Sequence, residues 1–524
     1  MTDDTTPAPA PAADDEEVVV HAPAGSLRGR WSDGVARFAG IPFAAAPVGP
    51  LRFMPPGAPP RWDGVREARH FGPICPQNPS LMDALFGGEA ERWDEDCLFL
   101  NVWTTDPSPA EPLPVMVWIH GGGFEMGSGS SPLYHGERFA HSDVVYVSIN
   151  YRLGSLGFLE LGGLDPALAG SGNNGLRDQV AALEWVRDNI SAFGGDAGNV
   201  TIFGESAGAM STALLMCMPS ARGLFHRVVV QSGSIGSARE PERAHGDAEE
   251  FLGHLGLDPA ERAATVTALR DLPVAEMLAA HGRMSAARMA DPEELIARFD
   301  NPLAFLPFRP VRDGDTVPHE PLAEVAGGAA AGIPLLVGTN LEEWKLFAMM
   351  APSPQDTEAL LGRMKLLTDE PDATLAAYLA EQPGASPAEV ECAALTDVVF
   401  RVPATDLADA QAPHAPVWQY RFDWRSPALG GILGAAHALE IPFVFDLVED
   451  HRLHVLVGPE APVELARGMH EAWVAFASGR SPEVPGAEWP ARSEGTRPVL
   501  CMGDGFTLCE DPQGATRALW TELP

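Results

Sequence analysis

Short apolar runs alternate with an amphipathic stretch along much of the chain. Each run spans three to six residues and carries few polar side chains, as expected of buried strands. These predicted strands are residues 98–103, 115–119, 144–149, 200–203, 228–231 and 335–337. Between them, Leu176–Asn189 has apolar side chains at positions 176, 180, 183 and 186, the spacing of one helix face. Strands that alternate with helices predict an α/β fold with a central, mostly parallel sheet flanked by helices.

Composition along the chain bears on domain organisation. Residues 1–17 are acidic and rich in Pro and Ala, so they bury too little apolar surface to fold, and we expect a disordered tail. No comparable linker interrupts residues 18–524, which we predict to be a single domain. Within it, residues 240–300 are rich in Ala, Leu, Glu and Arg and predict a helical insertion. Glu464–Ser478 predicts a further helix, ended by Gly479.

The charge balance excludes some classes of partner. The 524 residues include 35 Lys and Arg against 72 Asp and Glu, which gives a net charge of −37 at neutral pH. Nucleic acid and anionic membranes both require a basic surface, so we expect neither as a partner. Solubility alone accounts for the acidity. The alternative is a negative field that attracts cationic substrates, and such steering would weaken as salt is added.

The cysteines and the start of the chain bear on location. Six cysteines are scattered without a CxxC pair, which disfavours both a disulfide framework and a structural zinc site. The first 17 residues lack the basic and apolar regions of a secretion signal. No apolar run approaches the roughly 20 residues needed to cross a bilayer. We therefore expect a cytoplasmic protein.

Residues 204–208 read Gly-Glu-Ser-Ala-Gly, a GxSxG pattern. The pattern alone is a weak signal, but the predicted strand 200–203 leads into it and the helical segment 207–217 leaves it. A strand, a sharp turn and a helix hold a serine exposed in a strained elbow, and the helix N-terminus favours negative charge beside it. We therefore predict Ser206 as a nucleophile. The alternative is a glycine-rich turn with an incidental serine.

A run of three glycines, in His120–Phe124, directly follows the predicted strand 115–119. Consecutive glycines leave backbone N–H groups unobstructed, and a tetrahedral intermediate needs two or three such donors aimed at its oxygen. The N–H of Ala207, next after the serine, would be a further donor. A phosphate-binding loop is the alternative, but the GxxxxGK[ST] pattern is absent.

A serine hydroxyl needs a histidine to take its proton, and the chain has 15 histidines. His437 lies in a Gly- and Ala-rich stretch downstream of Ser206, as the order serine, acid, histidine requires, so we predict it as the base. Five other downstream histidines lack a comparable loop: His226, His319, His451, His454 and His470. After the predicted strand 335–337, the chain carries Glu342 and Glu343 as candidate acids. The residue pattern alone does not separate these two.

Together these motifs resemble the type-B carboxylesterase/cholinesterase family of α/β-hydrolases, and within it the bacterial para-nitrobenzyl-esterase-like carboxylesterases. The similarity runs from about residue 24 to the C-terminus. The segments that carry it are ARFAGIPFAAAPVGPLRF (36–53), EDCLFLNVW (95–103), NYRLGSLGF (150–158), GNNGLRDQ (172–179), FGGDAGNVTIFGESAGAMS (193–211), QSGS (231–234), VGTNLEE (337–343) and HALEIPFVF (437–445). The resemblance implies an α/β-hydrolase fold with helical insertions around the mouth of the active site.

The resemblance also implies an activity. Ser206 matches the family's nucleophile, Glu343 its acid and His437 its general base. Such a triad cleaves small to medium carboxylic esters through an acyl-enzyme intermediate, and it needs no metal or organic cofactor. We therefore expect a small-molecule ester as the substrate and no cofactor.

Further residues match supporting positions of the family. Gly122, Gly123 and Ala207 match the oxyanion hole, and Ser232 and Glu440 match a pair that buttresses the triad. The three-glycine hole is similar to that of family members that accept bulky, even tertiary, alcohol groups.

The sequence departs from the family at positions that bear on the substrate. Trp344 stands where the family commonly has Gly after the acid. Between Cys75 and Cys97 the one tryptophan is Trp93, close to Cys97, whereas choline-binding members carry it nearer the middle of the loop. A preference for choline esters is therefore not supported. The two cysteines match a disulfide of secreted members, and two reduced, buried thiols are the alternative.

Other functions fit the same residues. The triad permits an amidase, a carbamate hydrolase or a lactone hydrolase, because specificity lies in the pocket walls. A lipase would need a lid, for which residues 346–352 and 284–289 are candidates, although Met-rich stretches also fill cores. A non-catalytic binding protein on this fold typically lacks a triad residue, and here all three are present. A monomer and a homodimer are both compatible with the sequence.

Overall fold

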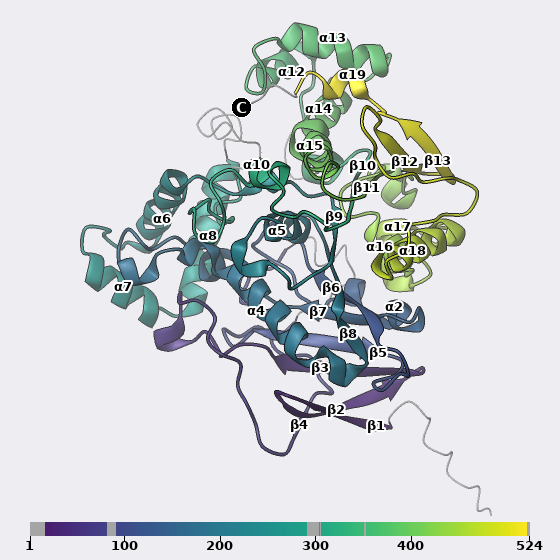
Figure 1. The fold of residues 1–524 in the computed structure, drawn as a ribbon. Helices are drawn as coiled ribbons and strands as arrows, with labels where there is room; N and C mark the ends of the chain where they lie inside the picture. The colour runs from purple at the N-terminus through teal and green to yellow at the C-terminus, as the bar shows by residue number, and fades with distance from the viewer. Residues whose placement is uncertain (1–15, 81–90, 291–302, 304, 350–352, 521–524) are drawn as a thin grey trace, which may run out of the picture.

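The structure is a computed structural model, and it describes residues 16–80, 91–290, 303, 305–349 and 353–520. In this part of the chain the strands form one sheet of 13, with helices on both sides of it (Figure 1). In chain order the strands are β1 (Glu17–Ala22), β2 (Gly25–Ser32), β3 (Val35–Pro42), β4 (Val65–Glu67), β5 (Phe99–Thr104), β6 (Leu113–Ile119), β7 (Val145–Ile149), β8 (Gly195–Glu205), β9 (Arg227–Gln231), β10 (Leu335–Asn340), β11 (Val417–Phe422), β12 (Pro498–Met502) and β13 (Phe506–Glu510).

The sheet is parallel in its centre and antiparallel towards its edges. The main strand order is β1-β2-β3-β5-β7-β6-β8-β9-β10-β11-β12-β13, and β4 pairs with β2. Every pairing from β7 to β12 along this order is parallel. Because parallel strands point the same way, the carboxyl ends of β6, β8, β10 and β11 lie at one edge of the sheet, where open α/β sheets bind their ligands. The predicted α/β class with a mostly parallel sheet is confirmed.

The six predicted strands are present as β5 to β10, with shifted ends. β8 begins at Gly195 rather than at residue 200, because backbone pairing with β6 already starts there, although the side chains between are not all apolar. Hydrophobicity marks the buried part of a strand, whereas hydrogen bonding sets its length. β1 likewise begins at Glu17, paired with Arg30, inside the predicted tail. Residues 1–15 of that tail lie outside the described residues.

Side chains of alternate residues on the central strands pack into two separate hydrophobic cores, one on each face of the sheet. On β6, Val115 and Val117 point into the core that α4 and α5 cover, and Met116 and Trp118 point into the core that α2, α16 and α18 cover. Both cores are apolar and almost fully buried, so the central strands are anchored from both faces. This anchoring makes the sheet edge a rigid base for the turns that follow each strand.

The helices lie mostly between the strands in sequence and cover the faces of the sheet (Figure 1). In chain order those described are α2 (Glu137–His141), α3 (Gly154–Phe158), α4 (Asn174–Asn189), α5 (Ala207–Leu215), α6 (Pro241–Leu255), α7 (Arg262–Asp271), α8 (Val274–Met289), α10 (Pro321–Ala326), α11 (Trp344–Ala348), α12 (Thr357–Met364), α13 (Pro371–Glu381), α14 (Pro387–Thr396), α15 (Val402–Gln411), α16 (Ile441–Val444), α17 (His454–Val457), α18 (Val463–Ala477) and α19 (Gly514–Arg517).

Three of these helices, α6, α7 and α8, form the group at the left of Figure 1. They occupy residues 241–289 of the segment 240–300 for which we predicted a helical insertion, and residues 291–302 lie outside the described part. The predicted helices at 176–189 and 464–478 are present as α4 and α18. Within the described ranges, no helix combines the length and the apolar composition that a membrane crossing requires.

Candidate active site

The turn between β8 and α5 holds Ser206 in a strained backbone conformation. Its φ of 55° and ψ of −123° lie in a region that residues other than glycine rarely occupy. The Ser206 N–H donates to the Gln231 carbonyl at 3.0 Å, and the Ser206 carbonyl accepts from Met210 N–H at 2.8 Å. The neighbouring strand and the first turn of α5 therefore fix the strained residue from both sides. Ser206 is partly exposed, whereas the residues around it are buried.

Glycine is required on both sides of the serine. A methyl group on Gly208 would lie 1.9 Å from the Ile119 carbonyl oxygen, and one on Gly204 would lie 2.6 Å from the same oxygen. Both contacts are too close for any side chain, because the end of β6 presses directly against the turn. The GxSxG pattern thus follows from the close approach of two parallel strands, in addition to the needs of the turn itself.

The segment after β6, residues 120–127, lies against this turn, and we call it the oxyanion loop. A methyl group on Gly121 would lie 3.1 Å from the Ser206 Cβ atom. Gly122 and Gly123 have φ values of +102° and +64°, which glycine adopts readily. Ala207 is the first residue of α5, next after the serine. Gly121 and Ala207 therefore lie directly beside Ser206, and Gly122 and Gly123 follow Gly121 along the oxyanion loop.

His437 and Glu343 come from two different loops and meet through their side chains. His437 lies between β11 and α16, and Glu343 follows β10 by three residues. The His437 Nδ1 atom lies 2.6 Å from Glu343 Oε2. The other carboxylate oxygen, Oε1, accepts from the Asn340 N–H at 2.6 Å, so both oxygens of Glu343 are occupied. When the imidazole is neutral and its Nδ1–H donates to Glu343, Nε2 carries the lone pair that a general base needs.

The neighbouring glutamate, Glu342, has a different environment. Its carboxylate accepts from Arg425 Nε and from the Ala435 N–H, both at 2.9 Å, and pairs with Lys345 at 2.8 Å. Burial opposes its ionisation, but these partners together lower the pKa of Glu342. Glu342 therefore fixes the loop that carries His437, whereas Glu343 contacts the imidazole. This separates the two glutamates that the residue pattern left open.

Glu205, the second residue of the GxSxG pattern, also contacts His437, a contact that the residue pattern does not predict. Its Oε1 atom lies 3.0 Å from His437 Nε2, which makes no hydrogen bond among the described residues. Burial raises the pKa of the Glu205 carboxyl well above its usual range. Burial also opposes a charged His437, but Glu205 and Glu343 outweigh it and raise the pKa of His437 to about 9.

Glu440 and Ser232, the two residues predicted to buttress the triad, make no hydrogen bond to each other among the described residues. Glu440 is buried and accepts from Asn340 Nδ2 at 2.7 Å and from Gln231 Nε2 at 3.1 Å. The Ser232 Oγ atom is buried and makes no hydrogen bond among the described residues. Asn340 and Gln231 can donate to the Glu440 carboxylate because they lie at the ends of β10 and β9, directly beside it. Asn340, which also binds the Ala436 carbonyl at 2.7 Å, is the link that the sequence did not reveal.

Two aromatic rings enclose His437. The ring centroids of Phe347 and Phe400 lie 5.1 and 4.8 Å from that of the imidazole. Phe347 belongs to α11, where Trp344 packs beside it at 4.9 Å, so this departure from the family fills space next to the base. Phe400 lies in a five-residue π-helical turn, Asp397–Arg401, a feature that often occurs at functional sites. The two rings hold the imidazole in place and limit the access of water.

Other features of the described chain show no second reactive centre. No group of three or more His, Cys, Asp or Glu side chains in the described ranges could hold a metal ion. Cys75 and Cys97 are buried free thiols, and the Cys75 contact together with burial raises the pKa of Cys97. We therefore find no metal centre and no disulfide between these two cysteines in this structure.

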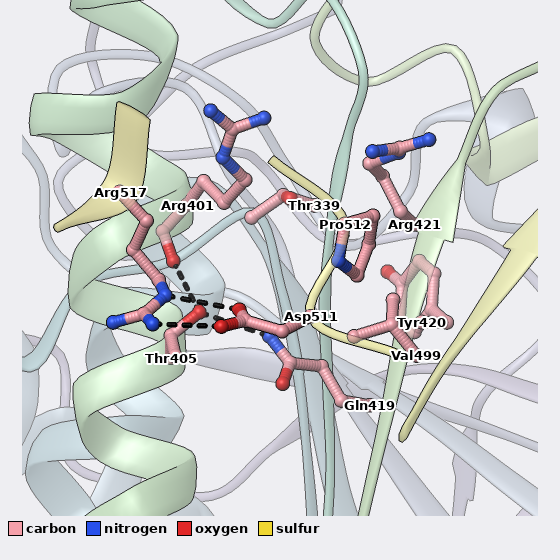
Figure 2. Close-up of a pocket in the computed structure, with 10 residues that line it drawn as sticks. All are labelled: Thr339, Arg401, Thr405, Gln419, Tyr420, Arg421, Val499, Asp511, Pro512 and Arg517. Carbon is pink, nitrogen blue, oxygen red and sulfur yellow. Dashed lines mark hydrogen bonds and ion pairs between the residues drawn. The ribbon is translucent and has the colours of Figure 1, made fainter. Parts of the chain in front are cut away.

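A small cavity lies between the sheet, α15 and the C-terminal segment (Figure 2). Water-sized molecules can occupy about 20 Å³ of it, room for little more than one. Its charged side chains are already paired: Arg517 with Asp511 at 2.8 Å, and Arg421 with Asp423 at 2.6 Å. No predicted site residue lines this cavity. The remaining lining residues are Thr339, Arg401, Thr405, Gln419, Tyr420, Val499 and Pro512.

Comparison with known proteins points to one family. The family model of the carboxylesterases matches residues 16–515. The chain is 40% identical over 497 residues to the para-nitrobenzyl esterase of Bacillus subtilis, covering 94% of this chain and 96% of that protein. It is 36% identical to the fumonisin B1 esterase of Sphingopyxis macrogoltabida, covering 94% and 87%. The solved structure of a Geobacillus stearothermophilus carboxylesterase aligns with a TM-score of 0.83 and 38% identity, over 96% of this chain and all of that chain.

Proposed function

The chain belongs to the carboxylesterase family and is a serine carboxylic ester hydrolase with the α/β-hydrolase fold, and from this we propose that Ser206, His437 and Glu343 perform the hydrolysis. Ser206 Oγ attacks the ester carbonyl carbon while His437 Nε2 takes its proton. Glu343 holds the imidazole by Nδ1 and stabilises its protonated form. The contact that carries this proposal is the 2.6 Å distance between His437 Nδ1 and Glu343 Oε2.

The oxyanion hole completes the first step. In the proposed mechanism, the carbonyl oxygen becomes negative and accepts from the backbone N–H groups of Gly122, Gly123 and Ala207. Their positions support this role, because the oxyanion loop touches the Ser206 turn and Ala207 begins α5. His437 then returns its proton to the leaving alcohol, and the acyl group stays on Ser206. A water molecule repeats the sequence to release the acid, and every step uses only groups of the protein and water.

The substrate is a small-molecule ester, and we propose short to medium acyl chains. The similarity to an enzyme named for para-nitrobenzyl esters supports a small ester, and the acyl length is what the p-nitrophenyl series below tests. We also propose a cytoplasmic location and a monomer or homodimer, to be tested by cell fractionation and by light scattering on the purified protein.

Hydrolysis of p-nitrophenyl acetate, butyrate and palmitate by the wild type and by Ser206→Ala tests the proposal. We expect rapid release from the two shorter esters and its loss in the variant. Preference for palmitate would favour a lipase instead. Hydrolysis by Ser206→Ala at the wild-type rate would contradict the assignment of the nucleophile.

A further inference from the structure

The shape of the oxyanion loop depends on the carbonyl group of Gly122. This oxygen accepts from the Glu125 N–H at 3.0 Å and from the Met126 N–H at 3.1 Å. The Gly122 carbonyl and the Gly123 N–H belong to one planar trans peptide and point in opposite directions. The two hydrogen bonds that fix the carbonyl therefore also fix the direction of the Gly123 N–H, which we assigned to the oxyanion hole.

The side chain of Glu125 ties this turn to the helical insertion. Its Oε1 atom lies 3.0 Å from Nε2 of His281 on α8, and the side chains are only 13% and 7% exposed. Neither atom makes a hydrogen bond among the described residues, so the two side chains meet at ion-pair distance without a hydrogen bond. The His281 ring also packs against Phe308 in a T-shaped arrangement, with ring centroids 4.8 Å apart.

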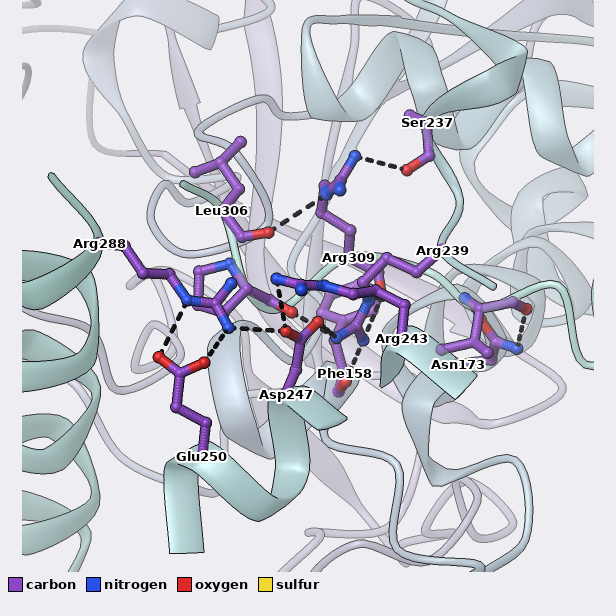
Figure 3. A network of polar contacts seen from close by, with 12 residues as sticks. Phe158, Asn173, Ser237, Arg239, Arg243, Asp247, Glu250, Arg288, Leu306 and Arg309 are labelled. Carbon is purple, nitrogen blue, oxygen red and sulfur yellow. Dashed lines mark hydrogen bonds and ion pairs between the residues drawn. The ribbon is translucent and has the colours of Figure 1, made fainter. Parts of the chain in front are cut away.

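A buried polar network fixes the helix that carries His281 (Figure 3). Arg288, near the end of α8, pairs with Asp247 at 2.6 Å and with Glu250 at 2.7 Å, both on α6. Asp247 also pairs with Arg239 at 2.8 Å, and Arg239 donates to the Phe158 carbonyl at 2.8 Å. Phe158 is the last residue of α3, in the main body of the domain. The network therefore ties α8 to the same frame as the oxyanion loop.

Hydrogen bonds from outside the oxyanion loop also hold it at Gly127 and Phe124. Gln77 donates to the Gly127 carbonyl at 3.0 Å and accepts from the Gly127 N–H at 2.7 Å. The Gly154 N–H, at the start of α3, donates to the Phe124 carbonyl at 2.7 Å. These hydrogen bonds hold the loop in place without the Glu125 side chain. Loss of the Glu125 side chain should therefore loosen the turn between them rather than unfold the protein.

We propose that the Glu125–His281 contact is a positioning device, which keeps the Gly123 N–H aimed at the oxyanion. The proposal rests on the proposed function, because it needs Gly123 to be a donor in the hole. Both residues act through the turn and need not touch the substrate. The expected signature is a loss in kcat with little change in KM, because the hole binds the transition state more strongly than the ground state.

Three variants test this role: Glu125→Ala, His281→Ala and Glu125→Gln. Removing an oxyanion donor outright costs about 100- to 1,000-fold in kcat, so a misaimed donor should cost about 10- to 100-fold in either alanine variant. Glu125→Gln keeps the size of the side chain and an oxygen that faces His281, and should recover most of the lost rate. The affinity for a trifluoromethyl ketone, which forms a tetrahedral adduct, should fall in parallel with kcat/KM. Glu276→Ala, at an exposed position on the same helix, is the matched control and should behave as wild type.

The same assays separate the two proposals. Wild type and Ser206→Ala run beside the variants; if Ser206→Ala keeps full activity, the proposed function fails and this role for Glu125 fails with it. If Ser206→Ala is inactive while both alanine variants keep wild-type kcat and ketone affinity, only the positioning role is overturned. Active-site titration with an organophosphate corrects each kcat for misfolded enzyme. A loss that disappears after this correction, or that Glu125→Gln does not relieve, would also overturn it.

Discussion

The turns that follow β6 and β8 are held mainly by backbone contacts, and they position Ser206 and the oxyanion loop. The loops that follow β10 and β11 instead meet through two side chains, Glu343 and His437. Ser206 sits in a turn whose strain is held by two backbone hydrogen bonds and by glycines that no larger residue can replace. Glu343 and His437, 94 residues apart, meet through one 2.6 Å contact inside a network of buried polar groups. The first region is specified locally, and the second depends on long-range packing. The two regions should therefore fail differently when changed.

The largest effect should come from removing one reacting residue of each region. Ser206→Ala and His437→Ala should each lower kcat by about 10⁵- to 10⁶-fold, because triad members act as a unit. For the same reason the double variant should be no worse than either single one. Steady-state kinetics on p-nitrophenyl butyrate checks this. Losses that multiply in the double variant would mean that the two regions act independently.

The adjacent glutamates give a matched comparison within the second region. Glu343→Gln should lower kcat by about 10⁴-fold, as for the acid of comparable triads, because His437 loses the group that orients it. Glu342→Gln leaves that contact intact and removes one charge from a partly exposed network with Arg425 and Lys345. It should cost less than about 10-fold, mainly through a looser loop. Equal losses in the two variants would contradict the assignment.

A substitution in the oxyanion loop, which belongs to the first region, should lower kcat by less than the loss of Glu343. In Gly122→Ala, the new methyl group would lie 2.2 Å from the Met126 carbonyl oxygen and force the oxyanion loop apart. We expect kcat to fall about 100- to 1,000-fold, the cost of an oxyanion donor, with KM nearly unchanged. Gly246→Ala on α6, where a methyl group meets no neighbour within 4 Å, is the control. The account would be wrong about this loop if both variants kept the wild-type rate.

The smallest effect is a shift in pH dependence. Glu205 and Glu343 together raise the pKa of His437 to about 9 against the effect of burial. Catalysis needs the neutral imidazole, so in Glu205→Gln the acid limb of the kcat/KM profile should move to lower pH. The same raised pKa stabilises the fold below about pH 6.5, and this contribution is lost as the pH rises through about 9. An acid limb that stays in place would show that Glu205 does not govern the base.

The sequence predicted the region around Ser206, which is specified locally, better than the region around Glu343 and His437, which depends on long-range packing. The strand, turn and helix around Ser206 follow from hydrophobic pattern and glycine spacing, and both are legible in a single sequence. Glu342 and Glu343 could not be separated from the pattern, because the distinction lies in partners up to 94 residues away. The pairing of Glu440 with Asn340 and Gln231, rather than with Ser232, depends on how β9 and β10 end side by side. Glu205 stands at a position of the GxSxG motif where any residue is allowed, so only its distance to His437 indicates a role for it.

Covalent trapping tests the central claim most directly. The enzyme is incubated with a fluorophosphonate ester, digested, and mapped by mass spectrometry, with Glu343→Gln treated in parallel. We predict one adduct, on Ser206, formed rapidly in the wild type and much more slowly in the variant, because Glu343 acts on the nucleophile through His437. An adduct on another residue, or equal rates in the two proteins, would contradict the account.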